Sequence, residues 1–147
     1  MSIKWLYYSE VSAETIDEAE SFYKVRLPES YKKIVMKYNG GYPQPSCYDM
    51  DSEKEKVFLN LLSAKETDKN NLYNITSILR ENGLNNIFAF GADPFGNYIC
   101  FDYSDSNDSP AVVYYDHENA FEYDDYKPKF ICKSFDELLN MLYEPEE

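Results

Sequence analysis

The sequence predicts a single α+β domain spanning residues 1–147. Its sheet is mostly antiparallel, and the helices packed around the sheet are expected on one side of it. Three observations predict this class. Amphipathic helical patterns fill much of the first third of the chain, and short runs of β-branched and aromatic residues fill the middle. Turn signals separate these runs closely, and strands joined by short turns pair antiparallel. A chain of 147 residues without a linker, internal repeat or low-complexity segment is the size of one ordinary domain.

Two helices are expected near the N-terminus. The first spans Ala13–Tyr23, where Ser12 is a favourable N-cap and the apolar residues recur on one face. The second begins at Pro28, because proline is tolerated in a first helical turn, and it ends at the Asn39-Gly40-Gly41 stop. Its apolar stripe consists of Tyr31, Ile34, Val35 and Tyr38.

The rest of the chain is predicted to hold most of the sheet. A third helix is expected at Leu72–Glu81, ended by Asn82-Gly83, and a last helix begins at Ser134 with the capping box Ser134-x-x-Glu137. Gly96-Asn97 favours a hairpin turn. The predicted strands are Val57–Leu62, Ile87–Phe90, Tyr98–Tyr103, Ala111–Tyr115 and Phe130–Cys132.

Composition excludes several classes of partner. The net charge of −13 argues against a nucleic-acid binder and an anionic membrane surface, because both need basic residues. No apolar run reaches the ~18 residues of a membrane span, and the first 14 residues lack the pattern of a secretory signal. We therefore expect a cytoplasmic protein. Its three cysteines, Cys47, Cys100 and Cys132, are expected to be free, buried thiols, because their number is odd and they form no CxxC motif.

The acidic residues are unevenly distributed. Residues 81–126 hold ten of the 27 Asp and Glu residues, none of the 14 Lys and Arg residues, and eleven aromatic side chains. A solvated face that aids solubility is one interpretation, and a surface for a basic partner is the other, since tyrosine is enriched in interfaces and one sign of charge steers encounter. Phe90, Phe95, Ile99 and Phe101 are expected to build the sheet and core. The predicted partner-binding acids are Asp93, Asp102, Asp105, Asp108, Asp116, Glu118, Glu122, Asp124 and Asp125.

The same segment partly matches a calcium-binding loop. With Asp105 as the first position, Asn107, Ser109 and Asp116 fall at the third, fifth and twelfth. The sixth position is Pro110, where that loop requires glycine, so we expect no calcium site. A carboxylate pair of Asp102 and Asp116 is a further alternative, although this spacing is not diagnostic of one.

Support for an enzyme is weak. His117 is the only histidine, and its surroundings favour a surface group at a strand end, while Cys100 lies among apolar neighbours in a predicted strand. The chain has no HExxH, GxSxG, P-loop or GxGxxG motif. We expect no catalytic residue, no metal and no cofactor.

Several segments, taken in order, resemble the SUKH superfamily, the Smi–Knr group. They are IDEAE at residues 16–20, LPESY at 27–31, YNGG at 38–41, FAFGADPFG at 88–96, ICFD at 99–102 and SFDELL at 134–139. The resemblance implies a compact α+β domain whose recurring residues, here Glu20, Leu27, Pro28, Tyr31, Asn39 and Gly40, make the fold. For bacterial members it implies an immunity protein, which binds and neutralises the toxic C-terminal domain of a polymorphic toxin, often a nuclease.

The acidic segment agrees with this implication, because a nuclease site that holds phosphate is basic. We therefore expect an immunity protein whose partner is a basic toxin domain. Charge reversal at Asp105 and Asp108 is then expected to slow association with that partner. A regulatory scaffold or ligand-sensing module is the alternative, and a cryptic enzyme or metal binder is the third class.

Overall fold

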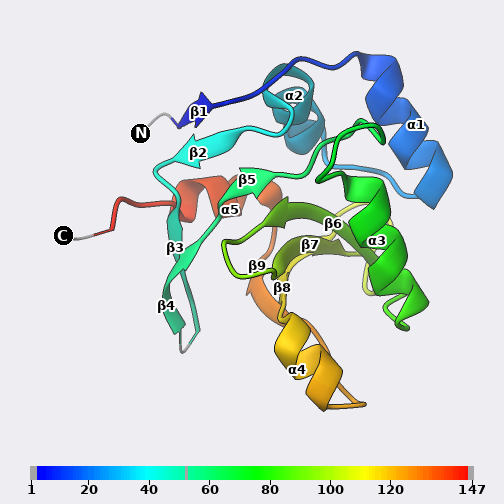
Figure 1. Cartoon of the computed structure of the whole chain (residues 1–147), viewed down its shortest axis with the longest axis vertical. Coiled ribbons are helices and arrows are strands. Elements are labelled where there is room, and N and C mark those ends of the chain that lie inside the picture. The colour runs from blue at the N-terminus through cyan, green and yellow to red at the C-terminus, as the bar shows by residue number, and fades with distance from the viewer. Residues whose placement is uncertain (1–2, 52, 146–147) are drawn as a thin grey trace.

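The computed structural model describes residues 3–51 and 53–145 and contains one five-stranded sheet with helices around it (Figure 1). In chain order the elements are β1 (Lys4–Leu6), α1 (Ala13–Tyr23), α2 (Glu29–Tyr38), β2 (Tyr42–Gln44), β3 (Cys47–Met50), β4 (Glu53–Val57), β5 (Asn60–Leu61), α3 (Leu72–Glu81), β6 (Ile87–Ala92), β7 (Tyr98–Asp102), β8 (Ala111–Tyr115), α4 (His117–Glu122), β9 (Lys129–Cys132) and α5 (Phe135–Met141). The predicted α+β class is confirmed.

The main sheet is an antiparallel meander. Its strands follow the order β5-β6-β7-β8-β9, and Cys100 in the central strand lies opposite Ala89 and Val113. Two smaller antiparallel pairs, β1–β2 and β3–β4, lie beside it. Strands that follow one another in the chain are neighbours in the sheet, as short connections require.

One face of the main sheet carries an aromatic core. Tyr31 of α2 and Phe135 of α5 pack against Phe90 and Phe101, with ring centroids 5.2–6.2 Å apart. All four side chains are fully buried. Burying aromatic rings of this size supplies a large share of the hydrophobic stabilisation of a small domain. Two of the helices therefore cover the same face, as the sequence predicts.

Helix α3 occupies a different place, along the edge of β6. The short strand β5 pairs only with Gly91 and Ala92, at the end of β6. Along the first part of β6, side chains of α3 take the place of a strand: the Thr76 Oγ1 atom accepts a hydrogen bond from the Ala89 N–H at 2.9 Å, and the Arg80 Nε donates to the Ile87 carbonyl at 3.0 Å. The helix thus satisfies backbone groups that an uncovered edge would leave unpaired.

Helix α1 and strand β8 have the bounds that the sequence predicts, and so does α3. Helix α2 begins directly after Pro28. The Ser12 hydroxyl accepts a hydrogen bond from the Thr15 N–H, and the Ser134 hydroxyl accepts one from the Glu137 N–H. Both predicted N-caps are confirmed.

The predicted strand Val57–Leu62 is wrong as a single element. The apolar run is divided, because the Phe58 N–H donates to the Ser46 carbonyl and the Leu59 N–H donates to the Ala92 carbonyl. Residues before Phe58 therefore pair with β3, and residues after it pair with β6. Strands β1, β2 and β3, residues 53–56 of β4 and helix α4 were not predicted, since each is short and lacks a clear periodic pattern.

Among the described residues, no helix combines the length and the apolar character that crossing a membrane requires.

Candidate partner-binding surface

The register of β7 and β8 separates the acidic residues into two groups. Asp102 lies opposite Ala111 at one end of this strand pair, whereas Tyr98 lies opposite Tyr115 at the other end. Asp105 and Asp108 belong to the loop at the first end, and Asp116 follows Tyr115 at the second. Four residue steps along a strand span about 13 Å. Asp102 and Asp116 therefore do not form a carboxylate pair, and the partial calcium-loop pattern is spread over the same distance.

Asp93 belongs to neither group because it is buried, with 7% of its surface exposed. Its Oδ1 atom accepts hydrogen bonds from the backbone N–H groups of Phe95 and Asn97, both at 2.8 Å. Its Oδ2 atom accepts from the Tyr114 hydroxyl at 3.1 Å. The expectation that Asp93 is displayed at the surface is wrong, since its carboxylate holds the β6–β7 turn together from inside.

Phe95, in the same turn, also differs from its predicted position. It was expected to build the core, but its side chain is 76% exposed. Residues 94–96 are all exposed, because the turn bends around Asp93 and directs them to solvent. Phe90, Ile99 and Phe101 are fully buried, as expected.

Helix α4 is anchored at its first turn by polar contacts. The Asp116 carboxylate accepts hydrogen bonds from the N–H groups of Glu118 and Asn119, which makes it the N-cap. The Asn97 Oδ1 atom accepts from the His117 N–H at 3.0 Å, and it lies 2.6 Å from the His117 Nδ1. An amide oxygen only accepts, so Nδ1 carries a proton. His117 thus begins a helix and ties it to the β6–β7 turn.

The rest of α4 is directed outward. None of its residues is buried, and Phe121 is 94% exposed and Tyr123 54% exposed. Glu118, Glu122, Asp124 and Asp125 are also exposed, and none of them makes an ion pair within the described part of the chain. We call residues 117–125 the α4 surface. In Figure 1 this helix projects beyond the end of the sheet.

A groove of about 1080 Å³ adjoins the α4 surface. Tyr115, Tyr126 and Leu84 supply its apolar side, while Glu118, Glu122 and Asp124 supply its charge. The Tyr115 and Tyr126 rings pack edge to face, with centroids 5.8 Å apart, and the Tyr126 hydroxyl accepts a hydrogen bond from the Asp116 N–H at 2.7 Å. A groove with both apolar and acidic walls fits a partner that has both apolar and basic side chains.

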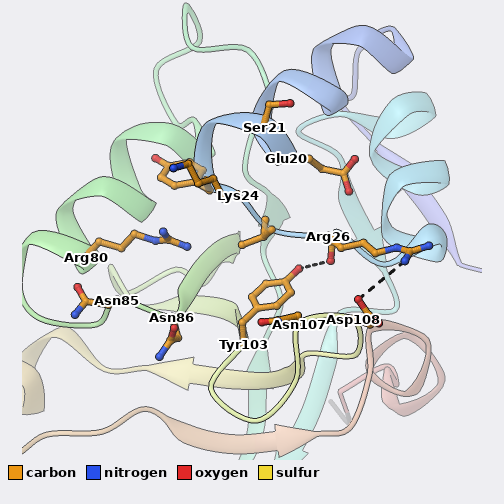
Figure 2. Close-up of a pocket in the computed structure, with 12 residues that line it drawn as sticks. Glu20, Ser21, Lys24, Arg26, Arg80, Asn85, Asn86, Tyr103, Asn107 and Asp108 are labelled. Carbon is orange, nitrogen blue, oxygen red and sulfur yellow. Dashed lines mark hydrogen bonds and ion pairs between the residues drawn. The ribbon is translucent and has the colours of Figure 1, made fainter.

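The β7–β8 loop group is a different environment. The Asp102 Oδ1 atom accepts a hydrogen bond from the Ser104 N–H at 2.9 Å, so this side chain shapes the turn. Asp105 and Asp108 are exposed, and Asp108 lies 4.0 Å from the Arg26 guanidinium (Figure 2). The nearby arginine reduces the negative charge of this loop. Arg26 lies far from this loop in the sequence, so no local signal predicts the neighbour.

The three cysteines are free and buried, as predicted. Burial raises the pKa of the Cys132 thiol to about 12, and burial together with the Asp102 charge raises the pKa of the Cys100 thiol further. Both thiols are therefore protonated at neutral pH, the form that is a poor nucleophile. Within the residues that the structure describes, no group of three or more His, Cys, Asp and Glu side chains is arranged to hold a metal ion.

Comparison with protein families identifies the fold. The family model SUKH_6, described as SMI1-KNR4 cell-wall, matches residues 13–139. The chain belongs to this family. The match extends from the start of α1 into α5, and it includes both groups of acids. No curated protein sequence matches the chain.

The structure explains the residues on which the SUKH resemblance rests. The Glu20 Oε2 atom accepts a hydrogen bond from the Leu27 N–H at 2.7 Å, which fixes the connection between α1 and α2. Asn39 is 2% exposed, and its side chain donates to the Ser63 hydroxyl and accepts from the Ala64 N–H. Leu27 and Tyr31 are buried in the core. Glu20, Leu27, Tyr31 and Asn39 of the SUKH domain therefore support the fold, as the resemblance implies.

Proposed function

We propose that this SUKH-family protein is an immunity protein, which binds the toxic C-terminal domain of a polymorphic toxin in the cytoplasm and thereby blocks it. The partner is a basic domain, for which a nuclease is the best candidate, and its contact is the α4 surface. The observation that carries this proposal is Phe121, which is almost fully exposed on a helix whose flanking residues are acidic.

The first support is the position of the aromatic side chains. Helix α4 buries no side chain of its own, so Phe121 does not contribute to the core. An exposed phenylalanine gains nothing from the hydrophobic effect in the free protein. In an interface the same ring becomes a buried anchor, and aromatic anchors surrounded by polar residues carry much of the binding free energy.

The second support is charge. Four acids of the α4 surface have no cationic partner among the described residues, so their field extends into solvent. A nuclease holds its substrate with basic side chains, because phosphate must be neutralised. Acids presented to such a site speed the encounter and exclude nucleic acid by occupying its place. This role requires neither a catalytic group, nor a cofactor, nor contact with a membrane.

The test is binding to the toxin domain that is encoded beside this gene, measured by stopped-flow and calorimetry at low and moderate salt. We expect tight one-to-one binding whose association rate falls with salt. The double change Glu118→Lys and Glu122→Lys is expected to slow association at least tenfold at low salt, on the order of the steering effect of a charged surface. Phe121→Ala is expected to speed dissociation instead, because it removes buried contact area and leaves the charge unchanged.

Two matched double changes serve as comparisons. Asp105→Lys with Asp108→Lys alters the other acidic group, and we expect a smaller effect there because Arg26 already offsets part of its charge. Asp17→Lys with Glu18→Lys alters exposed acids of α1, outside both groups, by the same total charge. Equal effects of all three pairs would attribute the change to net charge and contradict an α4 interface. No binding to the toxin domain would favour a regulatory scaffold with several weak partners.

A further inference from the structure

A second cleft is lined by the end of α1, the residues after α3 and the β7–β8 loop, and it gathers basic residues in a chain whose net charge is negative. It is open to solvent, with a volume of about 630 Å³ between the end of α1, the α1–α2 connection and the residues after α3 (Figure 2). Its lining includes Lys24, Arg26 and Arg80, three of only 14 basic residues in a chain of net charge −13.

Arg80 is the best-positioned of these cations. Its Nε atom donates to the Ile87 carbonyl at 3.0 Å, and its guanidinium lies over the Tyr23 ring, 4.8 Å from the centroid. The Tyr23 hydroxyl is in turn fixed by the Tyr73 carbonyl at 2.8 Å and by the Ser77 hydroxyl at 2.7 Å. Both contacts leave the two Nη atoms unused. No hydrogen bond or ion pair joins those atoms to another residue that the structure describes.

The two acids that line the cleft do not balance its positive charge. Glu20 is already engaged by the Leu27 N–H and by Lys32, whose amino group lies 3.4 Å away. Asp108 lies 4.0 Å from Arg26, so these two charges offset each other. Lys32 is shared with Glu29, 3.1 Å away, and among the residues that line the cleft the cations without an ion pair to a described residue are Lys24 and Arg80. Partial burial lowers the pKa of Arg80, but a guanidinium stays protonated at neutral pH.

Neutral donors surround the same charge. The amides of Asn85 and Asn86 are exposed and line the cleft, and Figure 2 shows them apart from the Arg80 guanidinium, on the segment that follows α3. No hydrogen bond connects either side chain to the rest of the described chain. Tyr103, whose hydroxyl donates to the Arg26 carbonyl at 2.7 Å, supplies an aromatic wall and holds the α1–α2 connection in place. The volume lies within the range of about 300–1,000 Å³ that is usual for small-molecule sites.

We infer that this cleft binds a small molecule through an oxyanion, a carboxylate or phosphate group, with the Arg80 guanidinium as its principal contact. An arginine whose fork is free and whose position is already fixed binds such a group bidentately at a low entropic cost. Lys24 adds a point charge, and the two asparagine amides donate to the remaining oxygen atoms. The inference does not depend on the proposed immunity function.

The test is a titration of the isotopically labelled full chain, followed by NMR, with succinate and with inorganic phosphate as separate probes at constant ionic strength. Saturable shifts are expected for the Arg80 side-chain N–H and the Asn85 and Asn86 side-chain amides, with dissociation constants below about 10 mM for a fragment-sized ligand. Arg80→Gln is expected to weaken binding at least tenfold, about the contribution of one charge-assisted pair. Lys33→Gln, an exposed cation of α2 outside the cleft, is the matched control and is expected to bind as the wild type does.

A second variant protects the test against misfolding, since Arg80 also supports β6. Lys24→Gln combined with Asn85→Ala changes only exposed side chains and is expected to weaken binding several-fold. Saturation by one probe alone identifies whether the site accepts the carboxylate or the phosphate. Absence of saturation by both probes overturns the inference, and so does equal binding by Arg80→Gln and the Lys33→Gln control. Neither result bears on toxin binding, which is measured separately.

Discussion

Tyr31 and Tyr48 bury hydroxyl groups that make no hydrogen bond to a described residue. Tyr31 lies among phenylalanine rings at the centre of the core, and burial raises the pKa of its phenol well above the usual range. Such a hydroxyl loses its contact with water on folding and gains little in return. Tyr23 differs, because its hydroxyl meets both the Tyr73 carbonyl and the Ser77 hydroxyl.

The pair Tyr31→Phe and Tyr23→Phe separates these two situations at the scale of one oxygen atom. We expect Tyr31→Phe to leave the free energy of unfolding unchanged or to raise it, since it removes an uncompensated polar group. Tyr23→Phe is expected to lower it by about 1 kcal/mol, since it removes satisfied hydrogen bonds. Urea unfolding at neutral pH measures both. A loss at Tyr31 as large as that at Tyr23 would show that the Tyr31 hydroxyl is satisfied in solution.

Asp93 shows what single residues do not reveal in a sequence. Aspartate before proline favours a turn, and the turn is present. Its burial could not be predicted, because the hydroxyl that donates to the carboxylate belongs to Tyr114, 21 residues away. For Asp105 and Asp108 the structure agrees with the expected exposure, but their part in binding stays a prediction.

At the scale of elements, α4 is the helix that depends most on polar contacts. It has six residues, too few for a helix that is stable by itself. No side chain of α4 is fully buried, and only Ala120 packs partly against the core, so its N-cap and its bond to the β6–β7 turn contribute much of what holds it against the domain. Asp116 is therefore a residue of the α4 scaffold, whereas Glu118 and Glu122 belong to the displayed surface.

Two substitutions of Asp116 distinguish its cap from its charge. Asp116→Ala removes the acceptor of the Glu118 and Asn119 N–H groups, and we expect a loss of about 1 kcal/mol in the local stability of α4. Amide hydrogen exchange would then be about fivefold faster at Ala120 and Tyr123. Asp116→Asn keeps a capping oxygen and removes the charge, so exchange there should change little. Fast exchange in both variants would mean that the charge, and not the cap, stabilises the helix.

The elements that the sequence predicts well are those with a strong local signal. Helix α1 combines an N-cap at Ser12 with a regular apolar face, and β8 is a run of β-branched and aromatic residues. Strand β3 has no such signal, because its residues alternate only weakly and it pairs with β4 through an irregular register. The apolar run at residues 57–62 misled the prediction, since pattern does not show where a strand changes partner.

At the scale of the whole molecule, the three thiols report how the domain opens. Cys100 lies in the central strand of the main sheet. Cys47 lies in the two-stranded β3–β4 pair, and its backbone exchanges hydrogen bonds with the backbone of Tyr143 near the C-terminus. Burial is the main cause that raises the pKa of both thiols. A raised pKa keeps each thiol protonated and unreactive up to alkaline pH, so labelling requires exposure to solvent.

We therefore expect a thiol reagent at pH 8 to label the native protein slowly and in a fixed order. Cys47 should react first, through local opening of the β3–β4 pair, and Cys100 only through global unfolding, because central strands have the highest local stability. Mass spectrometry of digested samples over time measures the order, and a sample in denaturant shows that all three thiols can react. Labelling of Cys100 as fast as Cys47 in native buffer would contradict a rigid central sheet.

The sequence by itself determined the α+β class, the caps and apolar faces of the main helices, and the strands of the central meander. It also determined that the thiols are buried and which family the chain resembles. These properties depend on residues within a few positions of one another, or on composition. Only the tertiary structure decided that Asp93 is buried and that the acids form two groups. The same holds for Arg80, whose guanidinium lies over the ring of Tyr23, 57 positions earlier in the chain. Such properties depend on strand register and on contacts between distant segments, which a one-dimensional pattern does not specify.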